Sequence, residues 1–275
     1  MIFFPPCKIN LGLNIVSRRP GGFHNLETSF YPVSWSDALE VIPHPAQKPF
    51  ELSCSGLQIP AEGENLIEKA WRLLKEKCDV PPVQVHLLKK IPMGAGLGGG
   101  SADAAYFLRL MKERFSLPVE KQELREIAAR LGSDCVFFLQ NEPMLASGKG
   151  DELESLDVSL ERFYIVIVYA GIHSSTREAY SAIKPHSPEY RPKDVLKLPP
   201  EEWRGKLKND FEPAIFGKYP ILEKLKDGLY KAGAVYASMS GSGSAIFGLF
   251  THAPELNLPA DHMVYIQQPG KNIFL

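Results

Sequence analysis

Residues 92–105 read PMGAGLGGGSADAA and place five glycines within seven positions, followed by small residues that favour helix. Glycine weakens a regular element, so a run of this kind indicates a backbone that turns tightly or lets another group approach closely. The start of a helix also presents unpaired N–H groups and a partial positive charge. The stretch therefore predicts a phosphate-binding loop rather than a plain turn.

The loop is expected to join a strand to a helix. Alternating apolar residues predict a strand over residues 81–88, and apolar spacing predicts a helix that begins after the loop, with Ser101 as its N-cap and Asp103 in its first turn. A Walker A pattern does not occur in the sequence. Gly94, Gly96 and Gly99 match the GxGxxG pattern of dinucleotide-binding oxidoreductases. That alternative is disfavoured, because it needs a strand next, whereas residues 118–132 predict a second helix.

The rest of the chain alternates strands and helices. Residues 7–16 predict a half-buried strand with Lys8, Asn10, Gly12 and Asn14 on its polar face. Further strands are predicted over residues 26–35 and 163–170, and helices over residues 65–78 and 220–233. Two short strands are predicted around a second glycine turn within residues 234–250. The charged stretch 148–162 predicts a boundary between domains 1–157 and 158–275.

Composition favours a globular protein with small-molecule partners. The 275 residues are 44% hydrophobic and carry a formal net charge of -1, without a basic run that would favour nucleic acid or an anionic membrane. The four cysteines lack metal-site spacing, which favours a reducing compartment. No targeting segment or long apolar run is present in the sequence. We therefore expect a cytoplasmic protein, either a monomer or a weak homodimer.

Four stretches resemble motifs of the GHMP kinases, in the order that this family has them. The stretch IPMGAGLGGGSADAA resembles the family's ATP-binding loop, which is unrelated to Walker A. The others are PCKINLGLNIVSRRPGGFHNLETSF (6–30), LGSDCVFFL (131–139) and ASMSGSGSAIFGLF (237–250). The sequence departs from the usual pattern at Cys7, Asp103 and Cys135-Val136, where alanine, asparagine and Val-Pro are common.

The resemblance implies an α+β fold of two domains, the first ribosomal protein S5 domain 2-like and the second a ferredoxin-like α/β sandwich. It also implies an ATP- and Mg²⁺-dependent kinase acting on a small alcohol. Within the family, the motifs are most similar to those of enzymes that phosphorylate the 2-hydroxyl of the methylerythritol unit of a CDP-linked substrate, on the non-mevalonate route to isoprenoid precursors. A different GHMP kinase remains the alternative.

The resemblance also implies roles for individual residues. Asp134, by itself a turn or cap residue, would be the catalytic base, and Lys8 would pair with it. Lys8 and Asn10 leave the same face of a strand about 6 to 7 Å apart, so both can hold one substrate. Phe23, His24 and Tyr180 would bind the cytosine.

The nucleotide end has the largest set of candidates. The residues expected to bind ATP are Asn65, Lys90, Pro92, Gly94, Gly96, Leu97, Gly98, Gly99, Gly100 and Ser101. Asn65 also fits the N-cap of a helix, and Lys90 also fits the end of a strand. Ser101 and Asp103 are open to either a structural role or a contact with phosphate or Mg²⁺, so the metal ligands stay unassigned. The turn at Gly241 and Gly243 is expected near the first glycine loop.

Overall fold

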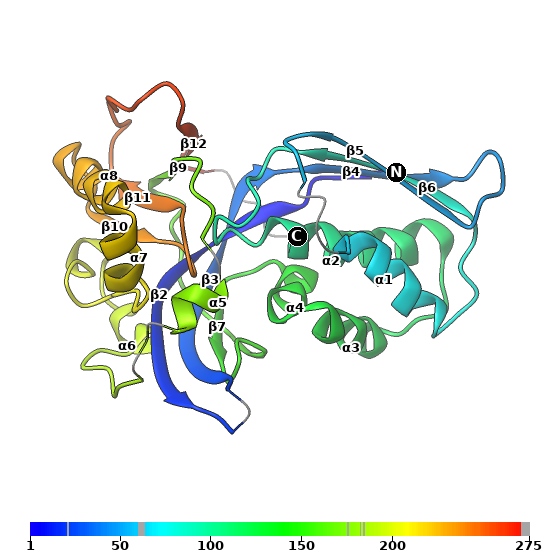
Figure 1. Cartoon of the computed structure of the whole chain (residues 1–275), viewed down its shortest axis with the longest axis horizontal. Helices are drawn as coiled ribbons and strands as arrows, with labels where there is room; N and C mark the ends of the chain where they lie inside the picture. Colours follow the sequence, from blue (N-terminus) through cyan, green and yellow to red (C-terminus); the bar gives the residue numbers. More distant parts are fainter. Residues whose placement is uncertain (21, 60–63, 175, 182, 184, 271–275) are drawn as a thin grey trace.

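The structure is a computed structural model that describes residues 1–20, 22–59, 64–174, 176–181, 183 and 185–270. Within these ranges the chain forms three four-stranded β-sheets. The longer helices pack on two of the sheets, and the remaining sheet, which contains β2 (Pro6–Arg18) and β3 (His24–Ser36), runs between the two halves of the molecule (Figure 1). Helices and sheets are largely segregated, as in the α+β class.

The first sheet and its helices form the half that carries the glycine loop. Its strand order is β1-β4-β6-β5, and only the β5–β6 pair is parallel. The strands are β1 (Ile2–Phe3), β4 (Ala38–Pro43), β5 (Phe50–Gly56) and β6 (Val83–Lys89). The helices are α1 (Leu66–Lys75), α2 (Gly99–Phe115), α3 (Lys121–Leu131) and α4 (Ser133–Gln140). Helices α1 and α2 lie nearest the sheet, so that Val85 and Phe107 are fully buried between the layers, and α3 and α4 pack on α1 and α2 from the other side (Figure 1).

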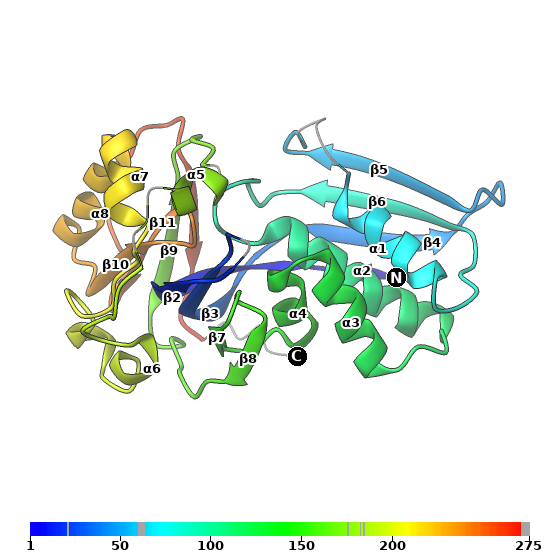
Figure 2. The same ribbon diagram turned by 60° about the horizontal axis from the view of Figure 1, so that its bottom comes forward.

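The second sheet contains the two longest strands and crosses the middle of the molecule (Figure 2). Its order is β2-β3-β7-β8, all antiparallel. The strands are β2 (Pro6–Arg18), β3 (His24–Ser36), β7 (Met144–Ser147) and β8 (Glu152–Ser155). The prediction that β2 is half-buried is wrong. Lys8, Asn10 and Asn14 are each at most 5% exposed, because the polar face lies against other segments rather than against water.

The third sheet has the order β10-β11-β9-β12 and is also antiparallel. Its strands are β9 (Tyr164–Tyr169), β10 (Tyr236–Met239), β11 (Ile246–Phe250) and β12 (Met263–Gln267). The helical segments of this half are α5 (Thr176–Ser181), α6 (Pro192–Val195), the 3₁₀ turn η1 (Pro200–Glu202), α7 (Glu212–Lys218) and α8 (Pro220–Lys231). Leu229 of α8 packs with Val166 and Ile246 in the core of this half.

The elements predicted from strong periodic patterns are confirmed, but the predicted start of the helix after the glycine loop is wrong. Helices α1, α2, α3 and α8 and strands β6 and β9 form where they were expected. Helix α2, however, begins three residues earlier than predicted: its N-cap is Gly98, in a left-handed conformation that glycine accommodates, so Ser101 lies inside the first turn. Asp103 falls beyond that turn.

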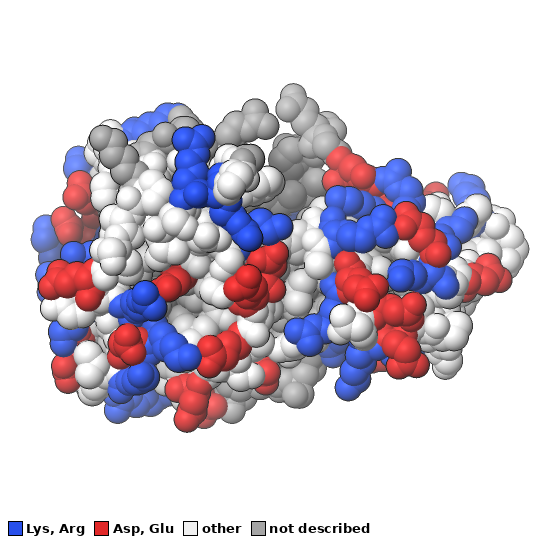
Figure 3. Space-filling view, turned by 90° about the horizontal axis from the view of Figure 1, so that it is seen from below, with Lys and Arg blue, Asp and Glu red and all other residues white. Residues whose placement is uncertain are grey.

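Two further observations concern the surface. Among the described helices, none combines the length and the hydropathy that a bilayer crossing requires. Figure 3 shows positive and negative side chains interspersed over one face of the molecule. That face therefore does not gather charge of a single sign.

Candidate active site

One cavity of about 1350 Å³ lies where the glycine loop, β2 and the segments of the second half meet. This volume exceeds that of an ordinary small-ligand pocket, about 300 to 1000 Å³. All predicted site residues except Asn65 and Lys90 line it. They are Lys8, Asn10, Phe23, His24, Pro92, Gly94, Gly96, Leu97, Gly98, Gly99, Gly100, Ser101, Asp134 and Tyr180. The cavity therefore joins residues that lie far apart in the sequence.

The glycine loop is a bare backbone wall of this cavity. Gly94, Gly96 and Gly98 have φ angles of 65°, 76° and 72°, which side chains rarely adopt. A Cβ on Gly96 would also overlap the carbonyl oxygen of Ser240. Beyond Gly98, the first turn of α2 leaves N–H groups without intrahelical acceptors, and the residues that carry them, Gly99, Gly100 and Ser101, line the cavity. An anion can approach here and accept hydrogen bonds from the backbone.

Lys8 connects the loop to the expected base. Its Nζ donates to Asn10 Oδ1 at 2.5 Å and to the carbonyl oxygen of Gly96 at 3.0 Å, and it lies 3.7 Å from Asp134 Oδ2. Burial lowers the pKa of Lys8, and attraction to Asp134 opposes that shift. The predicted pairing of Lys8 with Asp134 is therefore confirmed by the geometry of the two side chains.

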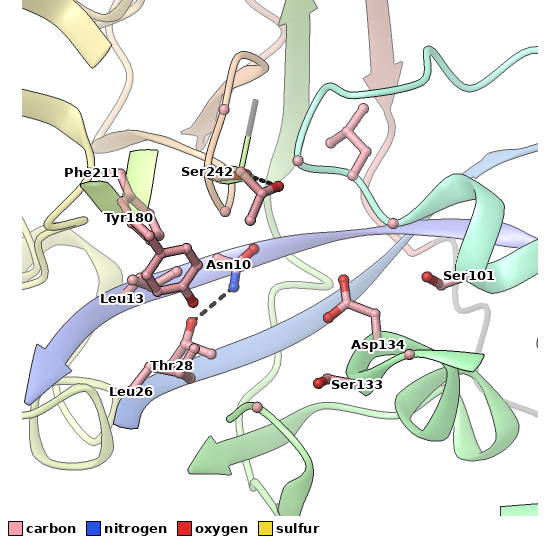
Figure 4. Close-up of a pocket in the computed structure, with 18 of the residues that line it drawn as sticks. Asn10, Leu13, Leu26, Thr28, Ser101, Ser133, Asp134, Tyr180, Phe211 and Ser242 are labelled. Atoms are coloured by element: carbon pink, nitrogen blue, oxygen red, sulfur yellow. Dashed lines mark hydrogen bonds between the residues drawn. The ribbon is translucent and has the colours of Figure 1, made fainter. Parts of the chain in front are cut away.

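Asp134 projects from the first turn of α4 into the cavity (Figure 4). Its side chain is 33% exposed, so a ligand can reach the carboxylate. Ser101, at the start of α2, and Ser133, beside Asp134, face the same space (Figure 4). This end of the cavity thus offers one carboxylate and two hydroxyl groups.

Hydrogen-bonded polar side chains lie at the floor of the cavity and directly behind it. Asn10 Nδ2 donates to Thr28 Oγ1 at 2.9 Å, and the Ser240 hydroxyl donates to the carbonyl oxygen of Gly96 at 2.9 Å. Ser240 precedes the second glycine turn, and a Cβ on Gly241 would lie 3.2 Å from the Gly96 carbonyl oxygen. The second glycine turn therefore lies against the first loop, as expected.

Aromatic side chains form the opposite end. The rings of His24 and Tyr180 stack with their centroids 5.2 Å apart, and Tyr180 meets Phe211 edge-on at 4.9 Å. Phe23 is 64% exposed, and Lys149 Nζ lies 5.8 Å from its ring centroid. Burial raises the pKa of Tyr180 to about 12, so its hydroxyl stays neutral. Burial lowers the pKa of His24, and Arg18 adds to the shift.

Two predicted ATP ligands lie elsewhere among the described residues. Asn65 is the N-cap of α1, where its Oδ1 accepts a hydrogen bond from the N–H of Ile67 at 2.9 Å. Lys90 follows β6 with an exposed side chain, and its N–H donates to Asp37. In this structure Asn65 therefore caps a helix and Lys90 follows the end of a strand, which are the structural roles that the sequence also allowed.

Asp103 is likewise outside the cavity. It is 3% exposed and accepts a hydrogen bond from Lys89 Nζ at 2.8 Å. Burial raises the pKa of Asp103 to about 8, although the nearby ammonium group of Lys89 opposes the shift. The Asp103 side chain is therefore buried against Lys89, and the structure does not support its predicted contact with Mg²⁺.

Several lining residues were missed by the sequence analysis. Thr28, Ser133, Ser242, Arg18, Lys149 and Phe211 all border the cavity. Ser133 and Ser242 lie inside motifs that were recognised, and Thr28 belongs to a predicted strand, so each had a local signal. Phe211 had none, because its segment carries no recognisable pattern.

The arrangement suits the transfer of a charged group to a hydroxyl. Backbone donors can hold phosphates at the loop, while a lysine and a carboxylate meet at the centre and aromatic rings offer a stacking surface at the far end. These parts lie in one cavity large enough for two ligands.

Comparisons with known proteins agree with this geometry. The family model described as GHMP kinases N terminal domain matches residues 65–142, and the one described as GHMP kinases C terminal matches residues 196–258. Proteins named 4-diphosphocytidyl-2-C-methyl-D-erythritol kinase are similar over nearly the whole chain. The one from Bacteroides fragilis is 49% identical, over 91% of this chain and 92% of its own length. The one from Parabacteroides distasonis is 47% identical, over 95% and 97%.

Solved structures agree on the fold. A crystal structure of 4-(cytidine 5'-diphospho)-2C-methyl-D-erythritol kinase has a TM-score of 0.76 and 34% identity, with 90% of each chain covered. Homoserine kinase from Cytophaga hutchinsonii has a TM-score of 0.63 at 16% identity, covers 96% of this chain and 94% of its own, and shares the fold alone. The predicted two-domain α+β fold is therefore confirmed, and the dinucleotide-binding alternative is not supported.

Proposed function

Since the chain belongs to the GHMP kinase family, we propose that it transfers the γ-phosphoryl group of ATP to the 2-hydroxyl of 4-diphosphocytidyl-2-C-methyl-D-erythritol. The relatives from Bacteroides fragilis and Parabacteroides distasonis that carry this name are 49% and 47% identical and align over nearly their whole length. The cavity also has a backbone cradle at one end and an aromatic surface at the other, as a nucleotide-linked alcohol and ATP together require.

The reaction needs positioning, charge stabilisation and a proton acceptor. The backbone of the glycine loop would hold the phosphates of ATP. The accepting hydroxyl oxygen would bond to the γ-phosphorus as the bond from that phosphorus to ADP breaks, and the hydroxyl proton would pass to Asp134. Lys8, 3.7 Å from that carboxylate, would stabilise negative charge around the accepting oxygen.

Mg²⁺ is proposed as the counter-ion of ATP. The described residues hold no group of three or more His, Cys, Asp or Glu side chains that could bind a metal by themselves. In kinases Mg²⁺ commonly takes most of its ligands from phosphates and water, with one or two protein oxygens. The Ser101 hydroxyl is an oxygen donor on the cavity wall and fits that role. When bound, the ion would neutralise phosphate charge during the transfer.

The cytidine is proposed to bind at the aromatic end. Tyr180 offers a neutral ring for stacking, and His24 lies against it. A base that stacks on the face of Tyr180 now covered by His24 would displace that imidazole, which would then face the edge of the base. Phe23, exposed at the rim, would cover the base from outside.

The division of the chain into domains 1–157 and 158–275 stays a prediction.

The observation that carries the proposal is the meeting of Lys8, Asp134 and the glycine loop in one cavity whose far end is aromatic. An assay of ADP release tests it, with ATP and Mg²⁺ and four alcohols supplied separately: the CDP-linked alcohol, mevalonate, homoserine and galactose. We expect turnover with the CDP-linked alcohol and little with the others. Preference for one of the other three would overturn the proposed substrate, and ATP binding without turnover of any alcohol would overturn the proposed reaction.

A further inference from the structure

A glycine-rich loop has few side chains with which to fix its own path, so its ends must be held from outside. The middle of this loop is anchored by the Ser240 hydroxyl and Lys8, both donating to the carbonyl oxygen of Gly96, and by the N–H of Ala245, which donates to the carbonyl oxygen of Ala95 at 3.0 Å. These contacts leave open what fixes the start of the loop and the helix that follows it.

The start of the loop is held by a single carboxylate. Asp37 Oδ1 accepts the N–H of Lys90 at 2.5 Å and the N–H of Ile91 at 2.9 Å, which are the first two residues after β6. The backbone N–H of Asp37 donates in turn to the carbonyl oxygen of Pro5 at 3.0 Å. Asp37 therefore ties the direction in which the chain leaves β6 to the segment before β2.

The end of the loop is held by the same network through Lys89. Its Nζ donates to Asp37 Oδ2 at 2.5 Å and to Asp103 Oδ2 on α2 at 2.8 Å. The ammonium group also lies against the first residue of that helix, since a Cβ on Gly99 would be 3.2 Å from it. One lysine thus bridges the strand before the loop and the helix after it.

The three side chains are sealed from solvent and from the cavity. The side chains of Lys89, Asp37 and Asp103 are 1%, 0% and 4% exposed, and none of the three lines the cavity. They cannot touch ATP or the alcohol. Removing one partner of a buried charge pair is costly, so a network of this kind holds its members in one arrangement.

From this placement we infer that Asp37, Lys89 and Asp103 form a buried brace that positions the glycine loop for ATP, with Asp37 acting through the N–H groups of Lys90 and Ile91. The inference rests on the proposed function, because it takes ATP as the ligand of the loop. The brace contributes to nucleotide binding and not to the chemical step, since no member reaches the cavity.

The test compares Asp37→Ala with wild type by calorimetric titration of a non-hydrolysable ATP analogue, followed by steady-state kinetics. We expect the Kd of the analogue and the KM of ATP to rise about tenfold, because two hydrogen bonds to a charged acceptor are lost. The KM of the alcohol should stay within about twofold. A merely structural role would instead reduce the active fraction, which lowers the apparent kcat and leaves both KM values unchanged.

Two further variants keep the test decisive. Asp103→Asn retains an oxygen acceptor for Lys89 and should fold, with an ATP Kd raised only about threefold, and it decides the question if Asp37→Ala does not fold. Glu76→Gln is the matched control, because Glu76 pairs with Arg130 at 2.7 Å on the surface of the same half, away from the loop. An unchanged ATP Kd in the folded brace variants, or an equal rise in Glu76→Gln, would overturn the inference. Because nucleotide binding is measured without the alcohol, failure of the proposed substrate would leave this result readable.

Discussion

Replacement of Asp134 by asparagine tests the centre of the proposed chemistry. The substitution keeps the size of the side chain but removes the proton acceptor. General acid–base catalysis contributes about 10²- to 10⁴-fold in rate, so kcat should fall by that factor, which corresponds to about 3 to 5 kcal/mol.

The fold should survive this change. The pair to Lys8 is 3.7 Å long, its carboxylate is 33% exposed, and asparagine keeps an oxygen acceptor at the same place, so the folded protein should remain stable enough to assay. Lys8 also keeps its contacts to Asn10 and to the carbonyl oxygen of Gly96. The pKa of Lys8 should fall further, because burial lowers it and the opposing charge would be gone.

The assay is ADP release at saturating ATP and alcohol, with the KM of ATP measured in parallel. Asp194→Asn is a matched control, because Asp194 also lies in the first turn of a helix and pairs with a lysine, Lys197, at 3.0 Å, but outside the cavity. We expect the ATP KM of Asp134→Asn within about threefold of wild type, since no loop contact is lost. Turnover within tenfold of wild type, or a comparable loss in Asp194→Asn, would refute the assignment of Asp134 as the base.

Three other outcomes are expected. Tyr180→Ala should raise the KM of the CDP-linked alcohol about fivefold through lost stacking, whereas Tyr180→Phe should not; equal KM values in wild type and the alanine variant would count against this subsite. Gly96→Ala should raise the ATP KM at least about tenfold, because a left-handed residue would gain a Cβ that overlaps Ser240, while Gly228→Ala, with open space around it, should not. A hydrogen bond with the backbone of Ser187 makes the largest contribution to raising the pKa of His186 above its ordinary value of 6.5, and the carboxylate of Asp210 makes the next largest. The stabilisation from its protonated form is therefore present below pH 6.5 and lost as the pH rises through the raised pKa, and an NMR titration giving 6.5 or less would contradict this.

The strand, loop and helix around the glycines were predictable because their signals are local. A period of two puts Lys8 and Asn10 on one face of β2, and in the structure they lie within hydrogen-bond distance. The same reasoning could not say that this face is buried. Burial of the polar face depends on Gly96 and Ser240, which come from distant parts of the chain.

The elements that were missed lack a periodic signal. Strand β5 is mostly exposed and polar, with serine and glycine along its second half, so it does not alternate clearly. In α4 the run from Cys135 to Leu139 is apolar on all sides, and such a run is as compatible with a buried strand as with a helix. Only the family resemblance, and no local pattern, gave Asp134 at the start of α4 a catalytic role.

The site residues differ in how far each can be assigned a single role. Within the part of the chain that the structure describes, no hydrogen bond or ion pair joins Asp134 to the glycine loop, and Asp37, Lys89 and Asp103 do not line the cavity. Changes at Asp134 and in the brace therefore separate chemistry from nucleotide binding. Lys8 cannot be separated in this way, because one buried ammonium group both donates to the carbonyl oxygen of Gly96 and pairs with Asp134. Its loss would disturb the position of the loop and the charge of the base together. A kinetic defect in a Lys8 variant alone therefore cannot show which of these two effects causes it. Comparison with Asp37→Ala, which disturbs the loop, and with Asp134→Asn, which removes the base, can separate them.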